Sequence, residues 1–181
     1  MIKVFTGPMY SDKSNSLIEE YKKIWDKSRV LCFKPSKDIR EFSKIHSRNN
    51  SLDIPCIVIK DLSEIDNHIQ DNTSTIFIDE IQFLTGSPEV LLWYSINREI
   101  DIYIAGLSLT SEQTPFGIMP EVLSYADEIV HLHACCSDCN KHNATLTYCL
   151  EKKTEDILVG SSMYIPLCPS CMVRRVKHAE K

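Results

Sequence analysis

Residues 2–25 constrain the fold more than any other segment, because they predict a strand, a tight loop and a helix in immediate succession. An apolar run with β-branched residues precedes the loop, and apolar residues recur at helical spacing after it. The loop fits the pattern G-x-x-x-x-G-K-[ST] at Gly7, Lys13 and Ser14, but Asp12 stands where the second glycine belongs. The sequence therefore predicts a phosphate loop with one altered position.

The residue types in this loop suit a polyphosphate ligand. Backbone N–H groups of such a loop converge, together with a helix N-terminus, on phosphate oxygens. Lys13 would add a positive charge, and the Ser14 hydroxyl would bind a Mg²⁺ held between the β- and γ-phosphates. Taken alone, the loop leaves open the alternative of a solvated turn with an ordinary helix cap.

The rest of the first 132 residues alternates between predicted strands and helices. Strands are expected at residues 30–33, 54–59, 75–78, 102–105 and 129–130. Helices are expected to begin near Asp61, at Ser87 with a serine cap, and at Pro120, and residues 36–52 are expected to be a polar, loop-rich segment. This alternation predicts an α/β fold of the phosphate-loop NTPase type, with a mostly parallel sheet covered on both faces.

Two carboxylates, Asp79 and Glu80, end the apolar strand predicted at residues 75–78. In phosphate-loop folds, an aspartate at the carboxyl end of a neighbouring strand helps to hold Mg²⁺. Ligands bind at this edge of a parallel sheet. An exposed acidic strand end is the alternative, but the phosphate loop at residues 7–14 favours a metal-binding role.

The C-terminal part of the chain contains two C-x-x-C pairs, Cys136 with Cys139 and Cys168 with Cys171. Each pair can place two thiolates on one tetrahedral ion, and four sulfurs complete the shell of a structural zinc. The rival ligands nearby are Cys135, His131, His133 and His142. Only the two pairs have matched spacings, so we predict a small zinc-binding unit at residues 133–181; reduced thiols without metal are the alternative.

Composition limits the remaining choices. The net charge of −5 argues against a nucleic-acid binder, and no apolar run is long enough to cross a membrane. Because the first predicted strand follows Met1 directly, we expect no signal peptide and a cytoplasmic location. In that compartment the eight cysteines are expected to be thiols or metal ligands rather than disulfides.

With these motifs identified, the chain resembles the type II thymidine kinase family across nearly its full length. The loop Gly7-Pro8-Met9-Tyr10-Ser11 resembles the family's phosphate loop, and Asp79-Glu80-x-Gln82-Phe83 resembles its DE-x-QF signature. The other matching segments are Lys34-Pro35-x-x-Asp38-x-Arg40, Gly106-Leu107, Pro115-Phe116-Gly117, and Val159-Gly160 with Tyr164. The resemblance implies a homotetrameric cytosolic enzyme with an α/β kinase core at residues 1–132 and a zinc-bearing lasso domain at residues 133–181.

The resemblance also implies an activity and a role for each matching residue. The reaction is transfer of the ATP γ-phosphoryl group to the 5′-hydroxyl of thymidine or a related pyrimidine deoxynucleoside, with Glu80 as general base. ATP and Mg²⁺ would be bound by Gly7, Ser11, Asp12, Lys13, Ser14 and Asp79. The nucleoside would contact Met9, Phe83, Leu107, Phe116 and Tyr164, for which ordinary core packing is the alternative.

The chain departs from the family pattern at three positions. Asp12 replaces the loop glycine, Ser111 stands where an aromatic ring would flank the base, and Gln113 lacks an expected positive charge. These departures leave open a second hypothesis, a catalytically weakened or inactive relative that acts by binding a nucleotide or a partner. A zinc-ribbon module for nucleic acid is disfavoured by the acidic charge balance.

Overall fold

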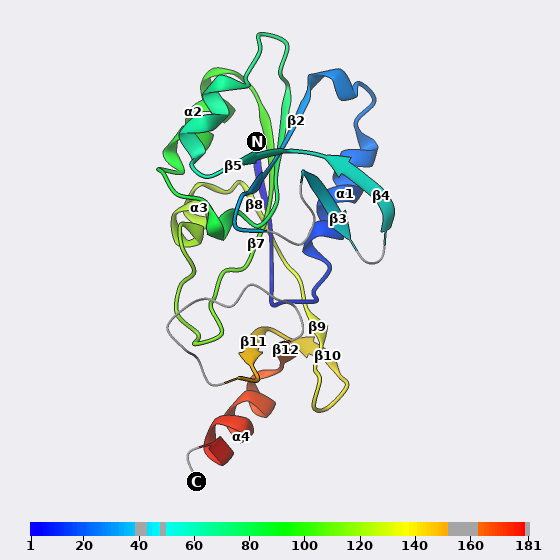
Figure 1. The fold of residues 1–181 in the computed structure, drawn as a ribbon, viewed down its shortest axis with the longest axis vertical. Coiled ribbons are helices and arrows are strands. Elements are labelled where there is room, and N and C mark those ends of the chain that lie inside the picture. Colours follow the sequence, from blue (N-terminus) through cyan, green and yellow to red (C-terminus); the bar gives the residue numbers. More distant parts are fainter. Residues whose placement is uncertain (39–42, 48–49, 152–162, 180–181) are drawn as a thin grey trace.

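A six-stranded parallel sheet forms the centre of the protein. The computed structural model describes residues 1–38, 43–47, 50–151 and 163–179. The strand order is β5-β2-β6-β7-β1-β8, and every neighbouring pair runs parallel (Figure 1). The strands are β1 (Ile2–Thr6), β2 (Val30–Pro35), β5 (Ile57–Ile59), β6 (Thr75–Ile78), β7 (Asp101–Gly106) and β8 (Glu128–His131). The predicted α/β class with a mostly parallel sheet is confirmed.

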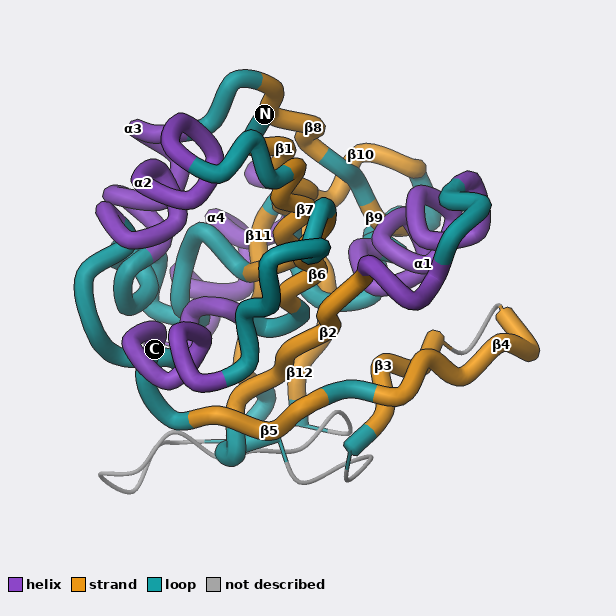
Figure 2. Tube along the Cα trace, turned by 90° about the horizontal axis from the view of Figure 1, so that it is seen from above, coloured by secondary structure: helices purple, strands orange, loops and turns teal. Residues whose placement is uncertain are grey.

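Helical segments and a hairpin cover the two faces of the sheet, as Figure 2 shows. One face packs against α1 (Lys13–Lys23) and the strands β3 (Lys44–Ser47) and β4 (Asn50–Pro55) around buried residues such as Phe77 and Leu17. The other face packs against the 3₁₀ helix η2 (Leu62–Asn67), α2 (Glu89–Asn97) and α3 (Met119–Tyr125). Two short 3₁₀ helices, η1 (Lys27–Arg29) and η3 (Ile81–Phe83), precede β2 and follow β6.

The expectation of a loop-rich segment at residues 36–52 is wrong in part. The structure forms the antiparallel pair β3–β4 there, and Ile45 lies opposite Ile54 in the register. Both side chains are almost fully buried, with 1% of their surface exposed. Each strand has only one such anchor in an otherwise polar sequence, so periodicity could not reveal the hairpin; burial on the sheet stabilises it.

Other predicted elements exist with different bounds. The strand expected at residues 54–59 is divided at Cys56, whose N–H donates to the carbonyl of Ser43 rather than to a sheet partner. The helix expected from Asp61 is the short 3₁₀ segment η2, with Asp61 and Glu64 forming a capping box. The helix expected from Ser87 begins at Glu89, after Pro88.

A smaller unit follows the sheet. It contains the antiparallel pairs β9 (Ala134–Cys135) with β10 (His142–Ala144), and β11 (Leu146–Cys149) with β12 (Tyr164–Leu167), before α4 (Pro169–Ala179). In Figure 1 this unit lies below the large sheet, and α4 leads away from it. The chain leaves the large sheet between His131 and Ala134. Across the described residues, no helix combines the length and apolarity that crossing a membrane requires.

Candidate functional site

The predicted phosphate loop connects β1 to α1. Gly7 lies close to the segment that joins β8 to β9, and a Cβ at Gly7 would be 2.4 Å from the carbonyl oxygen of Leu132. Lys13 is the first residue of α1 and is 8% exposed. Its Nζ donates to the Pro8 carbonyl at 2.7 Å and lies 3.5 Å from the Ser11 hydroxyl. The Lys13 ammonium therefore points into the loop, where a phosphate would be bound.

Asp12 occupies a conformation that usually belongs to glycine. Its φ of 59° and ψ of 31° are left-handed, and it is the N-cap residue of α1. Asp and Asn tolerate this region better than most other non-glycine residues. Asp12 is also exposed, so its carboxylate is solvated. The loop thus forms with an aspartate at the position of the second glycine.

The loop and the acidic strand end meet at Ser14. The Ser14 hydroxyl contacts both Asp79 carboxylate oxygens, at 3.2 Å and 2.9 Å, although the residues are 65 positions apart. The two parent strands are not neighbours, because β7 lies between β1 and β6; Ser14 reaches Asp79 from the first turn of α1. Hydroxyl and carboxylate oxygens are ligands suited to Mg²⁺, so this junction fits the metal predicted from the sequence.

Glu80 follows Asp79 in a left-handed conformation, with a φ of 52°. The backbone N–H of Glu80 donates to Asp79 Oδ1 at 3.0 Å. The side chain of Gln82 donates to Glu80 Oε2 at 2.6 Å. Glu80 is partly exposed, whereas Asp79 is 6% exposed.

Two of the aromatic residues predicted to contact a nucleoside, Phe83 and Phe116, meet one another. Phe83 and Phe116 pack edge to face, with ring centroids 5.3 Å apart and an interplanar angle of 84°. Leu107 begins the loop that ends at Phe116, and each of these two residues is 9% exposed. Gly117 must be a glycine, because its φ is +51° and a Cβ would lie 2.3 Å from the carbonyl oxygen of Gln82.

Residues of the small unit reach this part of the sheet. The N–H of Met9 donates to the Thr147 hydroxyl at 3.0 Å, and Gln113 Nε2 donates to the Thr147 carbonyl at 3.0 Å. Tyr164 is 9% exposed, and burial, with the nearby Cys149 and Glu112, raises its pKa. Sequence reasoning missed Thr147, because no pattern in the strand that carries it indicates a contact with the loop.

The sequence motif that begins at the end of β2 forms a buried ion pair. Lys34 Nζ lies 3.0 Å from the Asp38 carboxylate, and the two side chains are 3% and 8% exposed. Lys34 Nζ also donates to the Lys44 carbonyl at 3.3 Å, which connects β2 to the hairpin. Arg40 of the same motif lies outside the described residues, as do Val159 and Gly160.

The four predicted zinc ligands come together in the small unit. One sulfur from each of Cys136, Cys139, Cys168 and Cys171 lies within 4.8 Å of the others. Sulfurs bound to one tetrahedral zinc at ~2.3 Å would be roughly 3.8 Å apart, and the Cys139 and Cys168 sulfurs are 3.9 Å apart. Burial opposes ionisation of Cys136, but backbone N–H donors led by that of Cys168 lower its pKa to about 6. The cluster is compatible with zinc.

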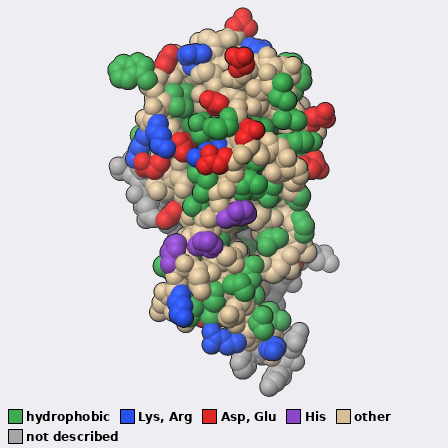
Figure 3. All heavy atoms as spheres, turned by 180° about the vertical axis from the view of Figure 1, so that it is seen from behind, with side chains coloured by type: hydrophobic (Ala, Val, Ile, Leu, Met, Phe, Trp, Pro, Cys, Tyr) green, Lys and Arg blue, Asp and Glu red, His purple; other side chains and the backbone are tan. Residues whose placement is uncertain are grey.

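The rival ligands do not join this cluster. Cys135 is exposed, as are the three histidines His131, His133 and His142. In Figure 3 histidine side chains lie on the surface where the large sheet meets the small unit. Among the described residues, the group of possible metal ligands consists of the four paired cysteines.

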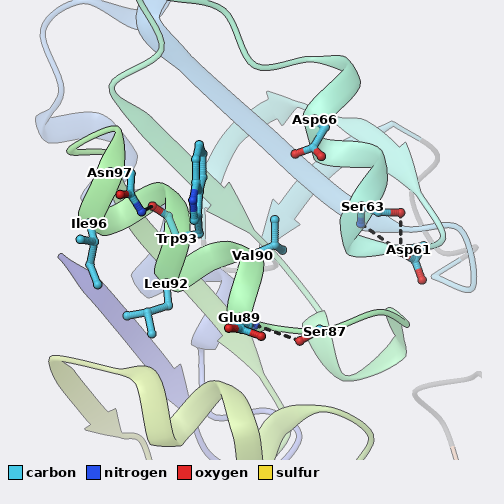
Figure 4. Close-up of a pocket in the computed structure, with 10 residues that line it drawn as sticks. All are labelled: Asp61, Ser63, Asp66, Ser87, Glu89, Val90, Leu92, Trp93, Ile96 and Asn97. Atoms are coloured by element: carbon cyan, nitrogen blue, oxygen red, sulfur yellow. Dashed lines mark hydrogen bonds between the residues drawn. The ribbon is translucent and has the colours of Figure 1, made fainter.

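A separate hollow of about 510 Å³ lies between η2 and α2 (Figure 4). The carboxylates that line it make hydrogen bonds within the protein. Asp61 accepts hydrogen bonds from the N–H and the hydroxyl of Ser63 at 2.9 Å and 2.7 Å, and Asp66 accepts one from the Tyr94 hydroxyl. None of the residues predicted to bind nucleotide, nucleoside or metal lines it. We therefore assign the candidate site to the edge of the sheet where Ser14 meets Asp79.

The geometry at that edge defines a class of protein. A loop that follows β1, a lysine aimed into it and a serine in contact with an acidic strand end are arranged as phosphate-loop nucleotide-binding proteins require. The edge lies at the carboxyl ends of parallel strands, where such folds bind ligands.

Comparison with known proteins narrows this class. The family described as thymidine kinase matches residues 1–172. A thymidine kinase from Pseudothermotoga lettingae is 29% identical over 173 residues, covering 94% of this chain and 93% of that protein. One from Mesomycoplasma hyopneumoniae is 31% identical over 174 residues, covering 94% of each chain. One from Aster yellows witches'-broom phytoplasma is 36% identical over 141 residues, covering 75% of this chain and 66% of that protein. The chain belongs to the thymidine kinase family.

Proposed function

We propose that this protein transfers the γ-phosphoryl group of ATP to the 5′-hydroxyl of thymidine, or of a related pyrimidine deoxynucleoside, in nucleotide salvage. The observation that carries the proposal is the contact of 2.9 Å between the Ser14 hydroxyl and the Asp79 carboxylate, directly beside Glu80. This contact supports the proposal because it brings a hydroxyl and a carboxylate suited to Mg²⁺ together next to Glu80, the residue proposed to accept the proton.

At the ATP end, the loop from Gly7 to Ser14 would hold the phosphates. Its backbone N–H groups and Lys13 supply positive charge, and Ser11 and Asp12 complete the loop. Ser14 and Asp79 would hold Mg²⁺, which neutralises charge on the β- and γ-phosphates when bound. Asp12 is accommodated because its backbone adopts the left-handed conformation and its side chain is exposed.

At the nucleoside end, Glu80 would accept the proton of the 5′-hydroxyl as that oxygen attacks the γ-phosphorus and ADP leaves. Its position after β6, next to Asp79, supports this role. Phe83, Leu107 and Phe116 would form an apolar wall for the deoxynucleoside. Met9 and Tyr164 would contribute from the phosphate loop and from β12.

The remaining assignments are also proposals. Zinc would be held by Cys136, Cys139, Cys168 and Cys171 as a structural ion with no open position for catalysis. Residues 1–132 would act as the kinase core and residues 133–181 as the lasso domain. A homotetramer and a cytoplasmic location are proposed on the basis of the resemblance. Light scattering of the purified protein would measure the number of chains per particle.

The enzyme is favoured over a catalytically inactive relative, because Lys13, Ser14, Asp79 and Glu80 occupy mutually consistent positions. A coupled ADP-release assay over a panel of deoxynucleosides tests the proposal. ADP release that depends on thymidine or another pyrimidine deoxynucleoside supports it. Absence of release with every nucleoside, together with retained ATP binding, would favour the inactive relative.

The role of Glu80 has its own prediction. General-base catalysis typically contributes about 10²–10⁴-fold, so Glu80→Gln is expected to lower kcat by that order and leave ATP affinity nearly unchanged. Steady-state kinetics and calorimetric ATP titration measure the two quantities. Asp79→Asn is the comparison variant, because it should instead weaken the dependence on Mg²⁺. Parental turnover in Glu80→Gln would show that the base lies elsewhere.

A further inference from the structure

The Gln82 side chain lies inside the protein between Glu80 and the backbone of Leu107. Only 3% of Gln82 is exposed. Its Nε2 donates to Glu80 Oε2 at 2.6 Å, and its Oε1 accepts the N–H of Leu107 at 3.0 Å. Gln82 therefore connects the segment after β6 to the residue that follows β7.

These two contacts determine how the amide is oriented. A backbone N–H can only donate a hydrogen bond, so the oxygen of the amide must face Leu107. A carboxylate oxygen can accept a hydrogen bond but cannot donate one, so the NH₂ group of the amide must face Glu80. Reversing the amide would place two donors together at one end and two acceptors at the other. The Glu80 carboxylate is thus held by a donor whose own position is set by the main chain.

Two glycines allow the chain to close around Gln82. A Cβ at Gly106 would lie 2.9 Å from Gln82 Oε1, and a Cβ at Gly117 would lie 2.3 Å from the Gln82 carbonyl oxygen. The close approach of Gly106 restricts the rotamers available to the Gln82 side chain, and the close approach of Gly117 restricts the Gln82 backbone. The same two segments lead into and out of the loop that carries Leu107 and Phe116.

On the basis of the proposed function, we propose that Gln82 is a positioning residue for phosphoryl transfer. It holds the Glu80 carboxylate where the proton of the 5′-hydroxyl is taken, and it ties that position to the backbone beside the nucleoside site. A base works only within hydrogen-bond reach of its proton, and a displacement of about 1 Å can cost on the order of 10²-fold in rate. Gln82 itself touches no reacting atom.

The test separates the donor of Gln82 from its acceptor. Gln82→Glu keeps the length of the side chain and an acceptor for Leu107, but it replaces the donor to Glu80 with a repelling carboxylate. We expect kcat to fall roughly 10- to 100-fold, while KM for thymidine and for ATP changes by less than about threefold. Gln82→Met, which is neutral and similar in volume, should also lower kcat and covers the case in which the charged variant fails to fold. Gln70→Glu is the control, because Gln70 is exposed and precedes β6, at the opposite end of that strand from Glu80.

A double variant shows whether Gln82 acts through Glu80. Adding Gln82→Met to Glu80→Gln should lower kcat by no more than about threefold further, because the group being positioned is already gone. Losses that multiply in the double variant would overturn the inference, since they would show that Gln82 affects kcat independently of Glu80. If Glu80→Gln is slow but both Gln82 variants keep the parental kcat, the inference about Gln82 is overturned while the proposed role of Glu80 stands. Parental kcat in Glu80→Gln, or no kinase activity in the parent, would overturn the role proposed for Glu80 and this inference with it.

Discussion

The large sheet and the four-cysteine unit are held together by different means. Among the residues that the structure describes, 17 buried residues form a continuous core on one face of the sheet, made almost entirely of Ile, Leu, Val and aromatic side chains, and eight more pack on the other face. The described core of the small unit has seven buried residues, and three of these are the cysteines Cys136, Cys168 and Cys171. The sheet is stabilised by apolar burial, whereas much of the small unit's interior consists of candidate metal ligands.

Because of this difference, one part of the site should form without metal, whereas the part contributed by the small unit should need it. A region with a small apolar core usually needs a metal or disulfides to fold. The phosphate loop, Asp79 and Glu80 belong to the sheet and should stay in place without the metal. Thr147 and Tyr164 belong to the small unit, so the contact of Thr147 with Met9 and the position of Tyr164 should depend on the metal.

Removal of the metal should give the largest effect. The apparent binding energy of structural zinc sites is about 10–16 kcal/mol in zinc-finger peptides and acts as folding energy. Chelation is therefore expected to abolish amide protection across residues 134–149 and 163–171 while the strands of the large sheet stay protected. Hydrogen exchange measures both regions in one sample.

Metal analysis provides the control for this prediction. Purified protein should contain about one zinc per chain, and Cys135→Ser should leave that content unchanged because Cys135 is exposed and outside the cluster. A content well below one zinc per chain would contradict the assignment.

A substitution in the core of the sheet should destabilise the sheet and leave the metal content of the small unit unchanged. Phe77 is fully buried and stacks on Tyr103 with ring centroids 4.9 Å apart. Phe77→Ala is expected to lower the free energy of unfolding by about 3–5 kcal/mol, as measured by urea titration, with the zinc content of the folded protein unchanged. Trp25→Ala is the matched control, because Trp25 is 98% exposed. If Phe77→Ala released the zinc from folded protein, the two regions would not be independent.

The smallest predicted effect concerns the loop itself. A carboxylate near a polyphosphate is repulsive, but Asp12 is exposed and therefore screened. Asp12→Gly is expected to tighten ATP binding by roughly tenfold, or about 1.4 kcal/mol, in calorimetric titration with a non-hydrolysable ATP analogue and Mg²⁺. Asp12→Asn keeps a side chain that tolerates the left-handed backbone and removes only the charge. Tightening in the glycine variant alone would assign the effect to the backbone, and equal affinity in all three forms would show that the carboxylate does not reach the phosphates.

Local patterns in the sequence predicted much of this protein. The loop at residues 7–14, the strand that precedes Asp79, the parallel α/β class and the two cysteine pairs could all be predicted, because each depends on residues close together in the chain. The hairpin β3–β4 could not, since its two anchors, Ile45 and Ile54, become informative only when they are paired and buried against the sheet.

The contacts that join these pieces were decided by the tertiary structure. Ser14 and Asp79 are 65 positions apart, and Met9 and Thr147 are 138 apart. The contact of Gln82 with Leu107 spans 25 positions, and it required Gly106 and Gly117 to bring two segments close together. Periodicity and ligand spacing report the environment of neighbouring residues, so the sequence by itself determined the elements and the residue types at the site. Strand order and the packing of the small unit against the loop determined which of those residues touch, because such contacts depend on how distant segments are placed in space.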